Sequence, residues 1–169
     1  MTRWTVMLAT VCALLGFASR AHAQKLLMGA DLSLGRGIER SDLLGDQLFR
    51  RMRTRLTAGI DGRIDEDRSQ GMAVLGFAEI EPHVSFGGEL RYLRWLSRGV
   101  VVFAGGTGVI APHTLAGFDV GAQFHIPLDK ETTSLYIEPS FAALPLGTDL
   151  PGDNVLLWGL LNVGIRAAF

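Results

Sequence analysis

A few histidines, serines and carboxylates on predicted strands are the residues best suited to catalysis. His83 and His125 are candidates for a general base, Ser85 and Ser140 for a nucleophile, and Glu138 for the carboxylate that orients the base. Together such groups hydrolyse esters or amides only if the fold brings them within hydrogen-bonding distance. The alternative interpretation, which we prefer, is that they join an interior network of hydrogen bonds and charges.

Metal binding is a second chemistry that the residue spacing allows. Glu79, Glu81 and His83 alternate along one predicted strand, so all three would point to the same face. Side-by-side groups of this kind more often pair with arginines, and we predict no metal site and no cofactor. The glycine-rich stretch 105–108 lacks the lysine and the helix pattern of a phosphate-binding loop, so we expect it to allow close strand packing.

The first 23 residues have the three parts of a secretory signal peptide. Arg3 supplies the positive charge, residues 6–17 are apolar, and Ala21 and Ala23 form a cleavage site of small residues. The apolar run is shorter than the ~20 residues of a typical membrane-spanning helix. We therefore expect cleavage after Ala23, with residues 1–23 as signal peptide and residues 24–169 as one barrel domain.

Cleavage there would determine what chemistry the mature chain can perform. The only cysteine, Cys12, would be removed, so no disulfide or thiol nucleophile would be available. The removed segment contains Arg3 and Arg20 and no acidic residue, which leaves a formal charge of −3 and argues against a nucleic-acid partner. No remaining stretch has the length of a membrane-spanning helix, so a protein that stays in a membrane must be a closed barrel.

Apolar and polar residues alternate repeatedly after residue 24, which indicates β-strands. In one clear case Met52, Leu56 and Ile60 share a face, while Arg53 and Arg55 share the other. The pattern predicts an all-β, eight-stranded antiparallel up-and-down transmembrane β-barrel, because most strands approach the ~9–11 residues that cross a bilayer at a tilt. The predicted strands are 25–35, 51–64, 72–84, 89–96, 100–110, 114–126, 133–144 and 154–169.

Some segments depart from simple alternation. Leu75, Phe77, Leu93 and Trp95 interrupt the polar faces of two strands, which predicts either that the barrel bends there or that apolar side chains fill part of the lumen. The amphipathic segment 36–50 is predicted to be a loop that contains a helical turn at the rim. Six aromatic residues are expected either in interfacial girdles or in the packed interior. They are Phe86, Tyr92, Trp95, Phe124, Trp158 and Phe169.

The charges on the polar faces balance, which favours a narrow interior filled by paired side chains over a water-filled channel. We predict a lumen charge network made of residues from most of the strands. Its members are Asp31, Arg53, Arg55, Asp61, Glu79, Glu81, Arg91, Asp119, Glu138 and Arg166. The alternative is a soluble barrel in which these charged faces meet water and the apolar faces point inward.

The end of the chain carries a more specific pattern. Asn162, Gly164 and the terminal Phe169 resemble the carboxy-terminal signal of bacterial outer-membrane barrels, although Ala167 is smaller than the usual residue. In size and layout the mature chain resembles the small OmpA-like and OmpX-like barrels of Gram-negative bacteria. The resemblance implies a cell-envelope protein in the outer membrane. The implied partners are the barrel-assembly machinery, membrane lipid and lipopolysaccharide, and the implied state is a monomer.

Three functions follow from these expectations. The first is an outer-membrane barrel without catalytic activity, serving a structural, adhesive or minor-permeability (porin-like) role. The second is a lipid A-modifying hydrolase, because some eight-stranded outer-membrane barrels that this chain resembles are lipid A deacylases that use a histidine and a serine. The third is a soluble periplasmic, lipocalin-like barrel that binds an apolar ligand. Segregation of the protein to the membrane or the soluble fraction separates the third from the other two.

Overall fold

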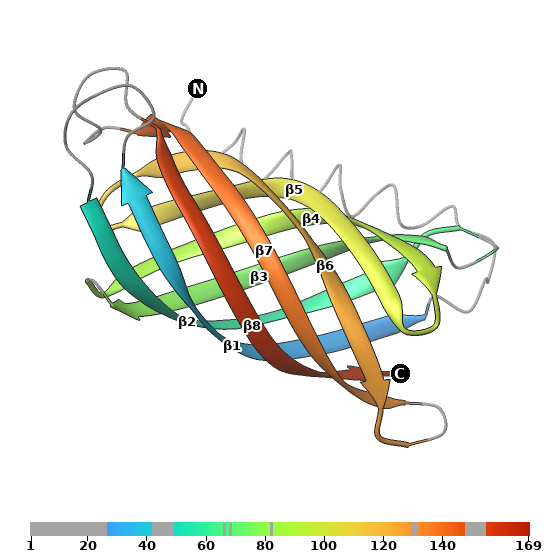
Figure 1. Ribbon diagram of the computed structural model, residues 1–169. Coiled ribbons are helices and arrows are strands. Elements are labelled where there is room, and N and C mark those ends of the chain that lie inside the picture. The colour runs from blue at the N-terminus through green and yellow to red at the C-terminus, as the bar shows by residue number, and fades with distance from the viewer. Residues whose placement is uncertain are drawn as a thin grey trace, which may run out of the picture.

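The chain forms one closed barrel in which each strand pairs antiparallel with the next and β8 pairs with β1 (Figure 1). The computed structural model describes residues 27–41, 49–65, 67, 69–81, 83–129, 132–147 and 155–169. The strands are β1 (Met28–Ser41), β2 (Phe49–Arg63), β3 (Gln70–Glu81), β4 (Ser85–Ser97), β5 (Val100–Ala111), β6 (Leu115–Pro127), β7 (Thr133–Gly147) and β8 (Leu156–Ala168). The predicted eight-stranded up-and-down barrel is confirmed, whereas the predicted signal peptide lies outside the described residues.

Both chain ends of the described barrel lie at one rim, which we call the terminus end. Met28 N donates to Phe169 O at 3.2 Å, and Phe169 N donates to Met28 O at 2.9 Å. The connections β2–β3, β4–β5 and β6–β7 are at this end, and the connections β1–β2, β3–β4, β5–β6 and β7–β8 are at the opposite rim, the loop end. The C-terminus is at the right of Figure 1, with the tips of the β2–β3 and β6–β7 connections.

The β2–β3 connection is closed by the carboxylate of Asp65. It accepts hydrogen bonds from Ser69 Oγ at 2.6 Å and from Gln70 N at 2.9 Å. Desolvation raises the pKa of Asp65, but these hydrogen bonds to the charged form outweigh it and hold the pKa below its usual range.

Three strand boundaries at the loop end differ from the prediction because polar residues and glycines obscured the alternation. β1 continues to Ser41 and β2 starts at Phe49, so both ends of the predicted loop 36–50 are strand. Its predicted helical turn is wrong at Ile38, and residues 42–48 lie outside the described part. β4 starts at Ser85, four residues before the predicted start, and two of its first four residues are glycines. A Cβ on Gly87 would come within 2.7 Å of Phe77 Cε2, so the glycine makes room for that ring.

The distribution of side chains is the reverse of that in a soluble protein. On the outside, Ile60 and Val74 are 51% and 57% exposed. On the inside, Asp61 and Glu79 are 2% and 1% exposed. An apolar exterior around a polar interior satisfies a bilayer and would be unfavourable in water. The molecule is therefore a transmembrane β-barrel. Among the described residues, no helix has the length and apolarity required to cross a membrane.

Apolar residues share the lumen with the charges. One buried cluster contains Phe77, Val109, Ala142, Leu144, Leu156 and Trp158, and another contains Ala73, Leu75, Leu93, Val101 and Phe103, with Trp95 packed against it. The alternative in which Leu75, Phe77, Leu93 and Trp95 fill part of the lumen is thus confirmed. The girdle alternative is wrong for Trp158, which is 1% exposed, because its position on β8 points inward. Phe86, Tyr92, Phe124 and Phe169 do lie on the exterior.

Candidate functional site

The centre of the lumen network is Glu79 of β3, which receives two arginines from β2. Glu79 Oε1 accepts from Arg55 Nε and Nη2 at 3.0 and 2.9 Å and from Arg53 Nε at 3.0 Å. Arg53 also pairs with Glu79 Oε2 and with Glu39. Ser85 Oγ donates to Glu79 Oε2 at 2.6 Å. Period-two alternation puts all these side chains on the inward faces of neighbouring strands.

The network continues across β4, β6 and β7. Arg55 Nη1 donates to Glu89 Oε1 at 2.6 Å, and Arg91 Nη2 lies 2.6 Å from Glu89 Oε2. Arg91 then reaches Asp119 Oδ2 through Nε at 2.8 Å and Glu138 Oε2 through Nη1 at 3.0 Å. A chain of ion pairs therefore runs across the barrel from Glu39 on β1 to Glu138 on β7.

A second group of charges lies between β1, β2 and β8. Arg166 donates from Nε and Nη2 to the two oxygens of Asp61, each at 2.7 Å. Asp31 points inward on the strand between them and is half-buried, and its partners in the ladders are Gly59 and Arg166. A planar guanidinium that meets a carboxylate with two bonds fixes both side chains in position.

Aromatic rings stack on the same arginines that the carboxylates bind. Arg53 Cζ lies 4.0 Å from the centroid of the Trp158 ring, and Arg55 Cζ lies 3.9 Å from that of Phe77. Arg91 Cζ lies 3.9 Å from the centroid of Phe103. These cation–π contacts place apolar rings against charged groups in the same cross-section. The interior is thus filled by side chains, as expected for eight strands.

Nine of the ten residues predicted for the lumen network point inward, but Glu81 does not. Its side chain is exposed and accepts a hydrogen bond from Thr54 Oγ1 at 2.9 Å. The ladder between β2 and β3 shifts register between Thr54 and Arg55, which ends the regular alternation just before Glu81. Glu39 and Glu89 belong to the network instead. Glu39 was missed because it was assigned to a loop, although it continues the alternation of β1.

The predicted hydrolytic groups are not brought together in the combinations considered. His83 is near Arg51, with 3.3 Å between Nε2 and Nη1. Ser85 donates to Glu79, and Ser140 Oγ lies 3.3 Å from Asn162 Nδ2. Glu79 and Glu81 face opposite sides, so they cannot bind a metal together with His83. Within the described residues, no three histidine, cysteine or acidic side chains form a metal-binding group.

His125 instead contacts Ser134, a residue that the sequence pattern did not single out. His125 Nδ1 lies 3.0 Å from Ser134 Oγ, and its Nε2 lies 3.1 Å from Gln123 Oε1. Gln123 Nε2 donates to Glu138 Oε2 at 2.7 Å, which fixes the orientation of the amide because a carboxylate only accepts. The histidine then donates from Nε2, and its Nδ1 accepts the serine hydroxyl.

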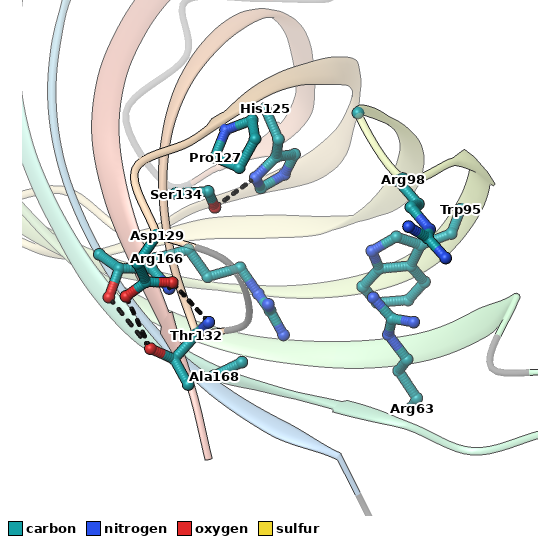
Figure 2. A pocket seen from close by; sticks show the side chains of 12 residues that line it. Arg63, Trp95, Arg98, His125, Pro127, Asp129, Thr132, Ser134, Arg166 and Ala168 are labelled. Carbon is teal, nitrogen blue, oxygen red and sulfur yellow. Dashed lines mark hydrogen bonds between the residues drawn. The ribbon is translucent and has the colours of Figure 1, made fainter.

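This histidine and serine border a cavity of about 320 Å³ at the terminus end (Figure 2). Arg63, Arg98 and Arg166 line it, and Arg63 Cζ stacks 4.5 Å from the centroid of the Trp95 ring. Asp129 closes the β6–β7 turn by accepting from Thr132 N at 2.7 Å. The cavity therefore presents cationic groups, one aromatic ring and a hydrogen-bonded serine to the aqueous space at this rim.

The three residues of the predicted assembly signal have separate structural roles. Asn162 Nδ2 donates to Glu138 Oε1 at 2.9 Å inside the lumen. A Cβ on Gly164 would collide with the ring of Tyr136, so the glycine admits that ring. Phe169 is 69% exposed, and its backbone pairs with Met28 at the start of β1. Their recognition by assembly machinery stays a prediction.

No protein-family model and no curated protein matches the sequence. Solved structures with a similar barrel include a designed transmembrane β-barrel, at 7% identity and a TM-score of 0.47 over 88% of this chain and 98% of that one. Neisserial surface protein A (NspA) is 16% identical, with a TM-score of 0.49 over 88% and 100% of the two chains. Ail from Yersinia pestis, solved with a heparin analogue, is 13% identical, with a TM-score of 0.42 over 84% and 99%. At such distances these likenesses carry no functional argument, and the fold rests on the strand pairing itself.

Proposed function

We propose that this protein is an outer-membrane barrel with a closed lumen that serves a structural or adhesive role at the cell surface and passes little solute. The observation that carries the proposal is the chain of ion pairs from Glu39 to Glu138 across the interior. A path for ions or solutes would have to separate buried arginine–carboxylate pairs, and breaking such a pair by removing one partner typically costs ~3–5 kcal/mol.

The apolar residues strengthen this closure. Phe77 and Trp158 meet edge to face, with ring centroids 6.3 Å apart, in the same region as Arg53 and Arg55. Aromatic side chains bury large apolar areas, so these rings fill the space beside the ion pairs. The exterior of such a barrel and its loops, more than its lumen, are then available for function. A minor-permeability role would require this closure to open.

The outer membrane is the proposed location because two features agree with it. A signal peptide cleaved after Ala23 would export the chain, and Asn162, Gly164 and Phe169 would address it to barrel-assembly machinery. Membrane lipid and lipopolysaccharide are the proposed partners, and a monomer is the proposed state. A soluble ligand-binding barrel is disfavoured because its exterior would expose Leu34, Val74 and Phe118 to water.

The test combines membrane fractionation with conductance. We expect the protein in the outer-membrane fraction, with unboiled and boiled samples that migrate differently on a gel. Inserted into planar lipid bilayers, the folded barrel should give no large steady currents. A protein found only in the soluble periplasm would contradict the membrane location, and large steady currents would contradict the closed lumen.

One observation favours a second candidate, a hydrolase that opens to the terminus end. The tautomer of His125 imposed by Gln123 is the one that accepts the proton of Ser134 Oγ. Labelling by a fluorophosphonate that is lost in Ser134→Ala and in His125→Phe, but retained in Ser140→Ala, would support this candidate. Absence of labelling in the folded wild-type barrel would remove it and leave Ser134 as a member of the interior network.

A further inference from the structure

Two arginines of β1 lie on the outward, apolar face of the barrel. Outward positions of β1 are Leu32, Leu34, Arg36, Ile38 and Arg40, and all five are exposed. Arg36 is flanked on its own strand by leucine and isoleucine, and its ladder partner on β8 is Leu161. An arginine there faces lipid, and lipid-facing arginines destabilise a membrane barrel unless their charge is compensated.

The position of Arg36 along the strand makes this compensation necessary. Arg36 lies five residues before Ser41, the last residue of β1. At ~3.3 Å per residue and a tilt of ~35–45°, its Cα is about 12 Å below the loop end of its strand. Arg40 lies one residue before that end. The two guanidinium groups therefore extend from the rim into the apolar belt along a single strand.

No described side chain neutralises either arginine. Neither forms an ion pair or a hydrogen bond with a described residue. Among the residues that the structure describes, Glu81 is an outward carboxylate at this end of the barrel, but it lies on β3, two strands away from β1, and accepts the Thr54 hydroxyl. Thr54 is the β2 partner of Arg36, and its hydroxyl donates to Glu81.

One outward position beside these arginines carries no side chain. Gly159 of β8 pairs with Ile38, between the partners of Arg36 and Arg40. A Cβ added at Gly159 would meet no heavy atom within 4 Å. Phe141 of β7, the other partner of Gly159, forms the far wall. The surface thus has a gap, the open space over Gly159, between the Phe141 ring and two arginines that pair with no described side chain.

We propose that Arg36 and Arg40 bind the phosphate groups of a lipid headgroup in the leaflet at the loop end, with part of the lipid lying in the gap over Gly159. Guanidinium groups bind phosphate through paired, charge-assisted hydrogen bonds. These hydrogen bonds are stronger where water is excluded. A phosphorylated lipid can reach both the rim and the belt, because its charged headgroup and its acyl chains belong to one molecule. The assignment of this leaflet to the cell exterior, and hence to lipid A, rests on the proposed function.

The test measures lipid binding to the folded, full-length mature barrel in dodecyl maltoside by native mass spectrometry. The probes are diphosphorylated lipid A and the same lipid without its phosphates. We expect wild type to prefer the phosphorylated lipid by about tenfold or more, and Arg36→Gln with Arg40→Gln to lose most of that preference. Arg36→Lys should keep part of it. Arg94→Gln removes an outward arginine at the terminus end and should keep all of it.

Two further measurements distinguish binding of the whole lipid from binding of a phosphate group alone. Gly159→Phe fills the gap with all charges intact and should weaken lipid A binding, while heat-modifiability reports that the variant is folded. Excess inorganic phosphate should leave bound lipid in place; displacement by it would mean that the site binds phosphate alone. Equal binding of both lipids, or no loss in the double arginine variant, would overturn the proposal. A non-conducting outer-membrane barrel with that result would keep its proposed function and lose only this site.

Discussion

Arg166 joins the last strand to the second by donating two hydrogen bonds of 2.7 Å to the carboxylate of Asp61, which lies 105 residues earlier in the chain. The pair spans β1, the strand through which the barrel closes. Both side chains are buried, so each depends on the other for compensation of its charge. This ion pair therefore stabilises the closed barrel, and no local sequence pattern could reveal it.

Replacing Asp61 by alanine should destabilise the folded barrel strongly, because Arg166 would remain buried without its partner. We expect a loss of roughly 3–5 kcal/mol in the free energy of unfolding, measured by urea titration of barrels in lipid vesicles. The double variant Asp61→Leu with Arg166→Met removes both charges and should be more stable than Asp61→Ala. A double variant that is less stable than the single one would contradict this account.

Removing Glu79 should open the lumen. Without it, Arg53 and Arg55 lose their common partner and repel each other as neighbours on the inward face of β2. Glu79→Ala is therefore expected to raise the conductance of single barrels in planar bilayers above that of wild type. Glu81→Ala is the matched control, because it removes a glutamate from the same strand but from the exterior. Equal conductance of the two variants would argue that the apolar clusters alone close the lumen.

The apolar belt can be tested by placing a charge in it. Val74 is 57% exposed in β3 and faces outward between Met72 and Gly76. In a bilayer, Val74→Arg should cost up to ~2–4 kcal/mol, with the larger value expected near the midplane. On the exterior of a soluble barrel the same change would be within about 0.5 kcal/mol. Urea unfolding in vesicles, with Val74→Ala as the control, distinguishes the two.

The turn at Asp65 gives a pH-dependent prediction. Its pKa is lowered in the folded protein, so its contribution to stability is present above the unfolded value of about 3.9 and is lost as the pH falls through the folded value. An NMR titration of the barrel in micelles should give a midpoint for Asp65 below 3.9. Gln70 N should lose its hydrogen-bonded shift over the same pH range. A midpoint at or above 3.9 would contradict the observed turn geometry.

Alternation along single strands was sufficient to predict the strand number, the antiparallel order and the polar interior. Each of these depends on residues two positions apart, such as Arg53 and Arg55, and needs no knowledge of distant contacts. The strand ends were less predictable. Glycines at the start of β4 carry no polarity signal, and Glu39 continues β1 inside a segment that looked like a loop.

For the candidate site, the sequence predicted which side of each strand a residue lies on, but not which residues of neighbouring strands come into contact. The pattern placed Asp119, Gln123 and His125 on one face of β6, but the hydrogen bond from Ser134 to His125 depends on the register between β6 and β7. Glu81 was predicted to point inward because it follows Glu79 by two residues. A register shift in the β2–β3 ladder turns its side chain outward instead. Registers and bulges are set by packing across strands, and one strand's sequence does not report them.

Gly164 and Gly159 lie on the same strand and should respond in opposite ways to an added side chain. A Cβ at Gly164 would lie 2.6 Å from Tyr136 Oη and 2.7 Å from Ser33 Cβ, whereas one at Gly159 meets nothing within 4 Å. We expect Gly164→Ala to destabilise the barrel by about 1–3 kcal/mol and Gly159→Ala to stay within about 0.5 kcal/mol, as measured by urea unfolding in vesicles.

The collision at Gly164 should be relieved by shortening the ring that causes it. Combining Gly164→Ala with Tyr136→Leu removes the aromatic atoms that the new methyl group would meet, so the double variant should lose less stability than the sum of the two single changes. A double variant that loses the full sum would mean that Gly164 is required for the backbone and not for the room it gives Tyr136. A stable Gly164→Ala single variant would contradict the close approach itself.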